Sequence, residues 1–174
     1  FADVRGFTPL SERLQPEAVV GLLNRYLRGM TDAIFAQQGT IDKYIGDAIM
    51  AMWNAPLDQK EHAVLAVKAG LAMQHSTKRL REREEVLRYG IGINTGPAVV
   101  GNIGSDERLE YTAIGDAVNL ASRLCGKAEG GQVMISESTF ELVKDEIVCE
   151  KLEPLQVKGK KKLVTVYRAV RVKE

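Results

Sequence analysis

Apolar residues recur at helical spacing in three stretches of the chain. In the first stretch Pro16 suits the opening turn of a helix, and Gly39 ends the pattern. A shorter helix is predicted after Ser136, whose side chain can cap it by accepting a hydrogen bond from the amide of Thr139. The expected helices cover residues 16–37, residues 60–83, residues 115–126 and a few residues after Ser136.

Alternating apolar and polar residues predict strands in the remaining stretches. Within residues 40–53 the alternation is interrupted by Gly46-Asp47, and Gly at the first central position indicates a type II′ hairpin. Residues 87–94 and residues 98–103 are expected to form a second hairpin around a Thr-Gly-Pro turn. Further strands are expected at residues 1–4, 111–114, 133–135, 147–155 and 163–172, with a turn at residues 5–8 and a polar loop at residues 104–110.

Strands and helices interleave along the chain, yet neighbouring strands are often predicted to be hairpins. This order predicts a single α+β domain over residues 1–174, with a mixed, largely antiparallel sheet and helices packed on one face. The chain begins at Phe1 within a strand pattern and without an initiator Met. We therefore expect a fragment of a longer protein, with its first strand truncated.

Charge and cysteine content exclude several classes of function. The chain has 24 Lys and Arg residues against 23 Asp and Glu residues, a net charge of +1, which lacks the basic surplus of a nucleic-acid-binding module. Two cysteines, Cys125 and Cys149, are too few for a disulfide framework and favour a reducing compartment. No apolar run approaches the ~18 residues of a membrane span. We expect a cytoplasmic domain without direct membrane contact, in a parent protein that could itself be attached to a membrane.

Two carboxylates are the first candidates for chemistry. Asp3 ends one predicted strand and Asp47 lies at a hairpin tip, so both would project at the same end of a sheet if these strands are neighbours. Two such carboxylates repel each other unless a cation lies between them, and so few protein ligands suit Mg²⁺. The amides of the following turn, at Gly6, Phe7 and Thr8, could face a phosphate. Ordinary turn and capping chemistry would explain both aspartates as well, so both interpretations stay open.

Basic and amide side chains form a second set of candidates. Asn119 and Arg123 are four residues apart and share one helix face, where they could bind ribose and phosphate. Lys158 could neutralise a triphosphate. A solvated helix face and a solvated charge run explain these residues about equally well.

Six short strings in one order carry a resemblance to a known family. They are residues 1–8 (FADVRGFT), 42–50 (DKYIGDAIM), 92–96 (GINTG), 101–104 (GNIG), 111–123 (YTAIGDAVNLASR) and 157–160 (VKGK). Together they resemble the class III nucleotidyl cyclase catalytic domain, in its bacterial and soluble-type adenylyl cyclase branch. Each string alone is weak, whereas all six in order are specific.

The resemblance implies a ferredoxin-like α+β core that works as a head-to-tail dimer with active sites at the subunit interface. It implies two divalent cations, Mg²⁺ or Mn²⁺, that use carboxylates of one subunit while the other subunit supplies the remaining groups. Because this chain holds the whole set, a homodimer could build two complete sites. The implied roles are metal binding for Asp3 and Asp47, base recognition for Lys43 and Thr112, ribose orientation for Asn119, and phosphate binding for Arg123 and Lys158.

The base-recognition pair predicts the substrate. Lys43 can only donate hydrogen bonds and Thr112 can accept one, which complements the N1 acceptor and the amino donor of adenine. We therefore expect an adenylyl cyclase that converts ATP to 3′,5′-cyclic AMP and pyrophosphate. The alternatives are a guanylyl cyclase, since a flexible Lys43 could reach guanine O6, and a catalytically silent domain that binds nucleotide and regulates a partner.

Two positions differ from other branches of the family. Mammalian membrane-bound adenylyl cyclases carry Asp where this chain has Thr112, and Thr there resembles members that bicarbonate stimulates, so activation by bicarbonate is a further expectation. The family also places a basic residue in the loop before the base-recognition position, and Arg108 is the nearest candidate.

Overall fold

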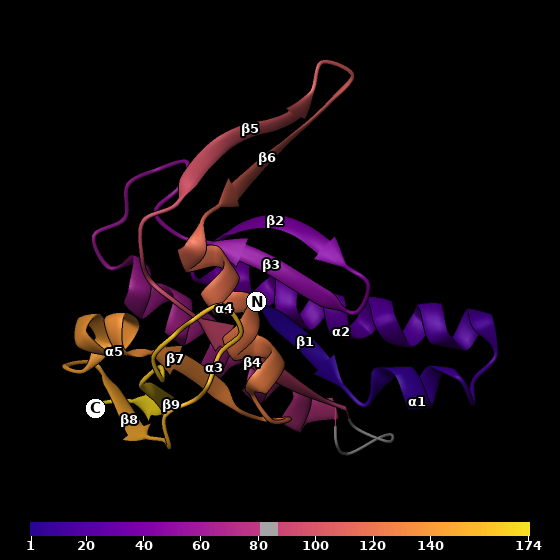
Figure 1. Cartoon of the computed structure of the whole chain (residues 1–174). Coiled ribbons are helices and arrows are strands. Elements are labelled where there is room, and N and C mark those ends of the chain that lie inside the picture. Colours follow the sequence, from indigo (N-terminus) through magenta and orange to yellow (C-terminus); the bar gives the residue numbers. More distant parts are fainter. Residues whose placement is uncertain (81–86) are drawn as a thin grey trace.

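The structure of the chain is a computed structural model that describes residues 1–80 and 87–174 (Figure 1). Its helices and strands are β1 (Ala2–Arg5), α1 (Phe7–Ser11), α2 (Pro16–Ala36), β2 (Thr40–Ile45), β3 (Ala48–Met52), α3 (His62–Leu80), β4 (Arg88–Ile93), β5 (Val99–Ser105), β6 (Arg108–Ile114), α4 (Asp116–Lys127), β7 (Val133–Ser136), α5 (Glu137–Val143), β8 (Ile147–Lys151) and β9 (Val166–Val172).

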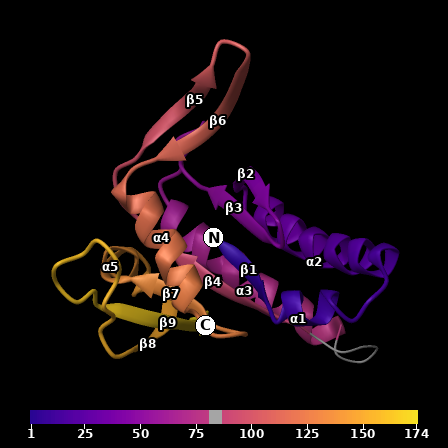
Figure 2. The same ribbon diagram turned by 45° about the vertical axis from the view of Figure 1, so that its right-hand side comes forward.

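Seven strands form the main sheet in the order β2-β3-β1-β4-β7-β9-β8. Every neighbouring pair is antiparallel except β4 and β7, which are parallel. The expected mixed, largely antiparallel sheet of an α+β domain is therefore confirmed. Strands β5 and β6 form a separate two-stranded sheet that projects away from the rest of the domain (Figures 1 and 2).

The helices cover both faces of the main sheet, which differs from the expected packing on one face. Helices α2, α3 and α5 share one buried core with the strands, in which Val133 and Ile135 of β7 take part. The intervening Met134 faces the other way and packs with Leu124 of α4 in a second core. A Cβ at Gly92 of β4 would lie 2.0 Å from the amide nitrogen of Cys125, so the glycine lets α4 lie directly on that face.

The predicted hairpin between residues 87–94 and residues 98–103 is wrong. Strand β4 has β1 on one side and β7 on the other, so neither of its edges is free. Strand β5 instead pairs with β6 along its whole length, and a two-residue turn at residues 106–107 replaces most of the polar loop expected at residues 104–110.

Other local expectations agree with the structure. The hairpin of β2 and β3 turns at Gly46, whose φ is +61°, as its sequence predicts. Pro16 is the first residue of α2, and Ser136 caps α5 by accepting a hydrogen bond from the amide of Thr139 at 3.3 Å. Helix α3 matches the helix expected at residues 60–83 as far as Leu80, and the end of that prediction lies outside the described residues. The segment expected as a turn at residues 5–8 already begins the short helix α1.

Candidate active site

The two candidate carboxylates lie at one end of neighbouring strands. Asp3 of β1 is opposite Ala48 of β3, and Asp47 directly precedes Ala48 in the turn. Burial raises the pKa of Asp3, and the negative charge of Asp47 raises it further, whereas the nearby Arg5 guanidinium lowers it. The two carboxylates are therefore close enough to repel each other, which is the arrangement that the sequence predicts for this edge of the sheet.

Arg5 connects this end of the sheet to the C-terminal end of α4. Its Nη1 donates to Asp3 Oδ2 at 2.5 Å, its Nε donates to the carbonyl oxygen of Ala128 at 3.0 Å, and its Nη2 donates to the carbonyl oxygen of Cys125. A guanidinium at the C-terminus of a helix also interacts favourably with the helix dipole. No role was predicted for Arg5 from the sequence. Its spacing of two from Asp3 along a strand, which puts both side chains on one face, could have identified it.

The donor set at the carboxylates fits a divalent cation that keeps most of its own water. Among residues 1–80 and 87–174, no group of three or more His, Cys, Asp or Glu side chains could hold a metal ion by itself. Two carboxylates are nonetheless the usual protein share at a Mg²⁺ site, where substrate phosphates supply further oxygens. A cation there would also relieve the repulsion that raises the pKa of Asp3.

The turn after β1 places three candidate amides beside the carboxylates. Gly6 has a φ of +79° and is the N-cap of α1, and its carbonyl oxygen accepts a hydrogen bond from the amide of Leu10 at 3.4 Å. The first amides of a helix have no partner within it, so those of Phe7 and Thr8 are free of helical bonds on geometric grounds. A phosphate-binding role for Gly6, Phe7 and Thr8 stays a prediction.

Lys43 and Thr112 come together where β2 meets β6. Lys43 Nζ donates to Glu110 Oε2 at 2.6 Å, and Thr112 Oγ1 donates to Asp42 Oδ2 at 2.5 Å. The bond from Lys43 lowers the pKa of Glu110 and raises that of Lys43 itself. Both candidate base-recognition residues are thus held by acidic neighbours, Asp42 and Glu110, for which no role was predicted from the sequence.

Arg108 lies at the start of β6, near the tip of the projecting hairpin. Its Nη2 donates to Glu110 Oε1 at 2.9 Å, so it reaches the base-recognition residues only through Glu110. Its side chain is 82% exposed.

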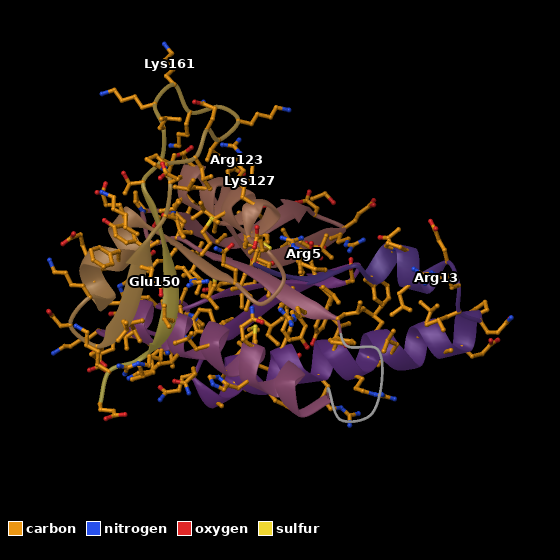
Figure 3. The ribbon with its side chains drawn as sticks, turned by 90° about the horizontal axis from the view of Figure 1, so that it is seen from below. Arg5, Arg13, Arg123, Lys127, Glu150 and Lys161 are labelled. Carbon is orange, nitrogen blue, oxygen red and sulfur yellow. The ribbon has the colours of Figure 1, made fainter. Side chains whose placement is uncertain are left out.

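The third group of candidates lies on and beside α4. Asn119 is exposed, and Arg123 is half-buried on the same helix. A Cβ at Gly159 would lie 3.4 Å from the Arg123 guanidinium, so the loop that carries Lys158 passes directly over Arg123. Figure 3 shows Arg123 beside this loop, with Lys161 at its outer end. An ion pair between Lys160 and Asp116 fastens the loop to the start of α4.

A cavity in the described part of the chain lies away from these three groups of residues. It has a volume of about 380 Å³ and is lined by β3, the end of β4 and the first half of α4, including Trp53, Thr95 and Ala117. None of the candidate site residues lines it. Within one chain, Arg5 links Asp3 to the C-terminal end of α4 through its hydrogen bonds.

Comparison with known proteins identifies the class. The model of the adenylate and guanylate cyclase catalytic domain matches residues 1–168. The chain belongs to this family, the class III nucleotidyl cyclase catalytic domains, as its sequence motifs indicate. Family members bind nucleotides, generally depend on metal ions, and form dimers.

Individual relatives cover nearly the whole chain. It is 37% identical over 179 residues to adenylate cyclase 1 of Rhizobium meliloti (strain 1021), covering 99% of this chain but 27% of that protein. The crystal structure of the adenylyl cyclase CyaB from P. aeruginosa superposes with a TM-score of 0.94 at 43% identity, covering 98% of this chain and 91% of the chain in that crystal structure. The crystal structure of the guanylyl cyclase Cya2 superposes with a TM-score of 0.90 at 39% identity, covering 99% of this chain and 90% of the chain in that crystal structure. Within the described residues, no helix is long and apolar enough to cross a membrane.

Proposed function

We propose that this domain is an adenylyl cyclase, which converts ATP to 3′,5′-cyclic AMP and pyrophosphate at sites between two copies of the chain. The observation that carries the choice of ATP is the pair of Lys43 and Thr112 at the junction of β2 and β6. Lys43 supplies only donors, and Thr112 already gives its hydroxyl proton to Asp42, so it is left as an acceptor. Adenine offers the matching acceptor at N1 and donor at its amino group, whereas guanine offers the reverse.

The remaining candidates fit an intramolecular phosphoryl transfer. The 3′-oxygen of the ribose forms a bond to the α-phosphorus, the bond from that phosphorus to the β-phosphate oxygen breaks, pyrophosphate leaves, and the 3′-hydroxyl proton passes to solvent. Asn119 orients the ribose for in-line attack, while Arg123 and Lys158 stabilise the negative charge that grows on the phosphates. The amides of Gly6, Phe7 and Thr8 bind phosphate oxygens.

Asp3 and Asp47 would hold the divalent cations, Mg²⁺ or Mn²⁺. Bound there, two such ions would lower the pKa of the ribose 3′-hydroxyl and neutralise the departing pyrophosphate, so no protein general base is required. The absence of a third carboxylate near Asp3 and Asp47, among the residues that the structure describes, supports ions that share the substrate's oxygens.

A homodimer supports this chemistry better than a single chain. The carboxylates lie at one end of the main sheet, Asn119 is exposed on α4, and neither lines the cavity beside β3 and α4. In a head-to-tail pair, Asp3 and Asp47 of one copy would face Lys43, Thr112, Asn119, Arg123 and Lys158 of the other. Each dimer would then contain two complete sites.

Two other proposals follow from the same residues. Activation by bicarbonate rests on Thr112 alone, and a flat response of the activity to bicarbonate at fixed pH would remove it. The relationship to the guanylyl cyclase Cya2 keeps GTP as the alternative substrate. A silent regulatory domain is disfavoured because all the metal, base and phosphate positions of the family are filled in this chain.

Product analysis tests the proposal. Purified domain is incubated with ATP or with GTP, in Mg²⁺ and in Mn²⁺, and the cyclic nucleotides are separated by chromatography. We expect cyclic AMP as the main product. Faster turnover of GTP would make the domain a guanylyl cyclase, and no cyclic product from either nucleotide would indicate the silent alternative.

A further inference from the structure

Asp42 is a fully buried side chain in contact with a proposed base-recognition residue. Its exposed side-chain fraction is 0%, and its Oδ2 accepts hydrogen bonds from Thr112 Oγ1 at 2.5 Å and from the amide of Ala113 at 3.2 Å. Its Oδ1 lies 3.6 Å from Lys43 Nζ and is buried without a hydrogen-bond partner. Buried carboxylate oxygens are costly unless their surroundings use them, so this placement calls for an explanation.

A β-bulge brings Asp42 to this position. Ile41 pairs with Ala51 and Lys43 pairs with Met50, so Asp42 is an extra residue with no partner on β3. In a regular strand Asp42 and Lys43 would point to opposite faces, but at the bulge both side chains contact β6. Their two partners on β6, Glu110 and Thr112, are two residues apart and therefore share a face of that strand.

The contact decides what Thr112 can offer to a substrate. A threonine hydroxyl has one proton to donate and two lone pairs that accept, so a free hydroxyl could bind either the amino group of adenine or the O6 of guanine. A carboxylate oxygen only accepts, so the Thr112 proton is directed to Asp42. The lone pairs of Thr112 are what remains for the base.

We infer that Asp42 is a positioning residue for substrate choice, which fixes the Thr112 hydroxyl as an acceptor and thereby favours adenine over guanine. This inference rests on the proposed function, because it assumes that Thr112 faces the base. Asp42 itself touches no substrate in this account. A site whose polar groups are committed in one direction rejects the wrong partner more strongly than a site whose groups can rotate.

Kinetic specificity tests the inference. The ratio of kcat/KM for ATP to kcat/KM for GTP is measured for the wild type and for Asp42→Ala, Asp42→Asn, Thr112→Val and the Asp42→Ala/Thr112→Val double variant. Asp42→Ala frees the hydroxyl to donate to guanine, so the ratio falls about tenfold or more. Asp42→Asn is the matched control, because an amide oxygen in the place of Oδ2 accepts the same two hydrogen bonds, and the ratio stays within about threefold.

The double variant separates this role from a purely structural one. With no hydroxyl at position 112, Asp42→Ala has nothing to redirect, so it leaves the ratio of the Thr112→Val protein unchanged. The inference is overturned if Asp42→Ala leaves the wild-type ratio unchanged, if the fall persists in the Thr112→Val background, or if Asp42→Asn lowers the ratio as much as Asp42→Ala does.

A second variant, Thr112→Val, tests the inference if the Asp42→Ala protein does not fold. Thr112→Val alone is expected to lower kcat/KM for ATP about tenfold and to change that for GTP by less than about threefold, because the lost group was an acceptor. Equal losses for both nucleotides would overturn the inference. Where turnover of either nucleotide is too slow, displacement of a bound fluorescent ATP analogue by ATP or by GTP gives the ratio of the two dissociation constants, which is expected to shift in the same direction.

Failure of the proposed function gives a different result. A wild-type protein that prefers GTP contradicts the adenylyl cyclase assignment, whatever the variants do. A wild-type protein that prefers ATP by a ratio insensitive to Asp42→Ala contradicts only the role of Asp42.

Discussion

The carboxylate end of the main sheet and the projecting β5–β6 hairpin differ in how much of their packing the chain itself supplies. Asp3 lies on β1, which has β3 on one side and β4 on the other, and Ala2 and Val4 beside it are buried. The hairpin pairs only with itself, and its Leu109 is 58% exposed. One region is complete within a single chain, whereas the other presents apolar surface that a second copy would cover.

The hairpin nevertheless carries half of the proposed base-recognition pair. The two faces of the hairpin carry different side chains. Glu110 and Thr112 point toward β2, whereas Leu109 and Tyr111 alternate with them and point away from β2. The hydrogen bonds of Thr112 to Asp42 and of Lys43 to Glu110 connect the β5–β6 hairpin to the main sheet. The proposal thus assigns base recognition to one face of the hairpin and dimerisation to the other.

The largest effect on activity is expected at the carboxylate end of the main sheet. Asp47→Asn should lower kcat for cyclic AMP formation about a thousandfold or more, because a metal ligand is lost. Asp47 lies in a turn and is only half-buried, so the thermal unfolding midpoint should change little. Asp145→Asn, an exposed aspartate outside the site, is the control and should stay within about twofold. Activity of Asp47→Asn within tenfold of the parent would refute the metal assignment.

A smaller loss is expected on α4. Arg123→Ala should lower kcat about a hundredfold with a lesser change in KM, because the guanidinium stabilises charge that develops in the transition state. Lys127→Ala, an exposed cation one turn further along α4, should stay within about twofold. Steady-state kinetics with ATP distinguish the two variants, and equal losses in both would point to a general effect of helix charge instead.

The hairpin is expected to govern association. Leu109→Asp puts a charge on the face turned away from β2, so it should weaken dimerisation about tenfold or more without disturbing the Thr112 contact. Sedimentation velocity over a range of protein concentrations measures the change. Leu142→Asp on α5, where the parent residue is similarly exposed at 54%, should leave the dimer intact. A dimer unaffected by Leu109→Asp would place the interface elsewhere.

The smallest effect is expected at Arg5, which connects β1 to the C-terminal end of α4. Arg5→Met removes the hydrogen bonds to Cys125, Ala128 and Asp3 and should lower the free energy of unfolding by about 1–2 kcal/mol. Urea unfolding measures this, and Arg13→Ala at an exposed position should change the free energy by less than about 0.5 kcal/mol. No difference between the two variants would mean that the Arg5 contacts add nothing to stability.

Local sequence patterns sufficed where local forces decide the structure. Pro16 at the start of α2, the Gly46 turn and the Ser136 cap act over a few residues, and all three were predicted. Pairing between distant strands was harder. The preference of β5 for β6 follows from β4 already having two neighbours, which no local pattern contains.

The candidate residues themselves came from spacing and from the family resemblance, but their partners did not. Asp42 was within a quoted motif, yet the alternation of a regular strand would have turned it away from Lys43, and only the bulge brings the two together. Arg5 acquires its role from carbonyl groups more than a hundred residues away. Such contacts depend on the assembled fold and cannot be deduced from neighbouring residues.

The central claim is that each active site takes its carboxylates from one chain and Asn119, Arg123 and Lys158 from another. Mixing Asp47→Ala protein with Arg123→Ala protein, each nearly inactive alone, tests it directly. After subunit exchange about half of the dimers are mixed, and each has one of its two sites intact, so about a quarter of the wild-type activity should return. No recovery, despite exchange demonstrated with labelled subunits, would contradict the claim.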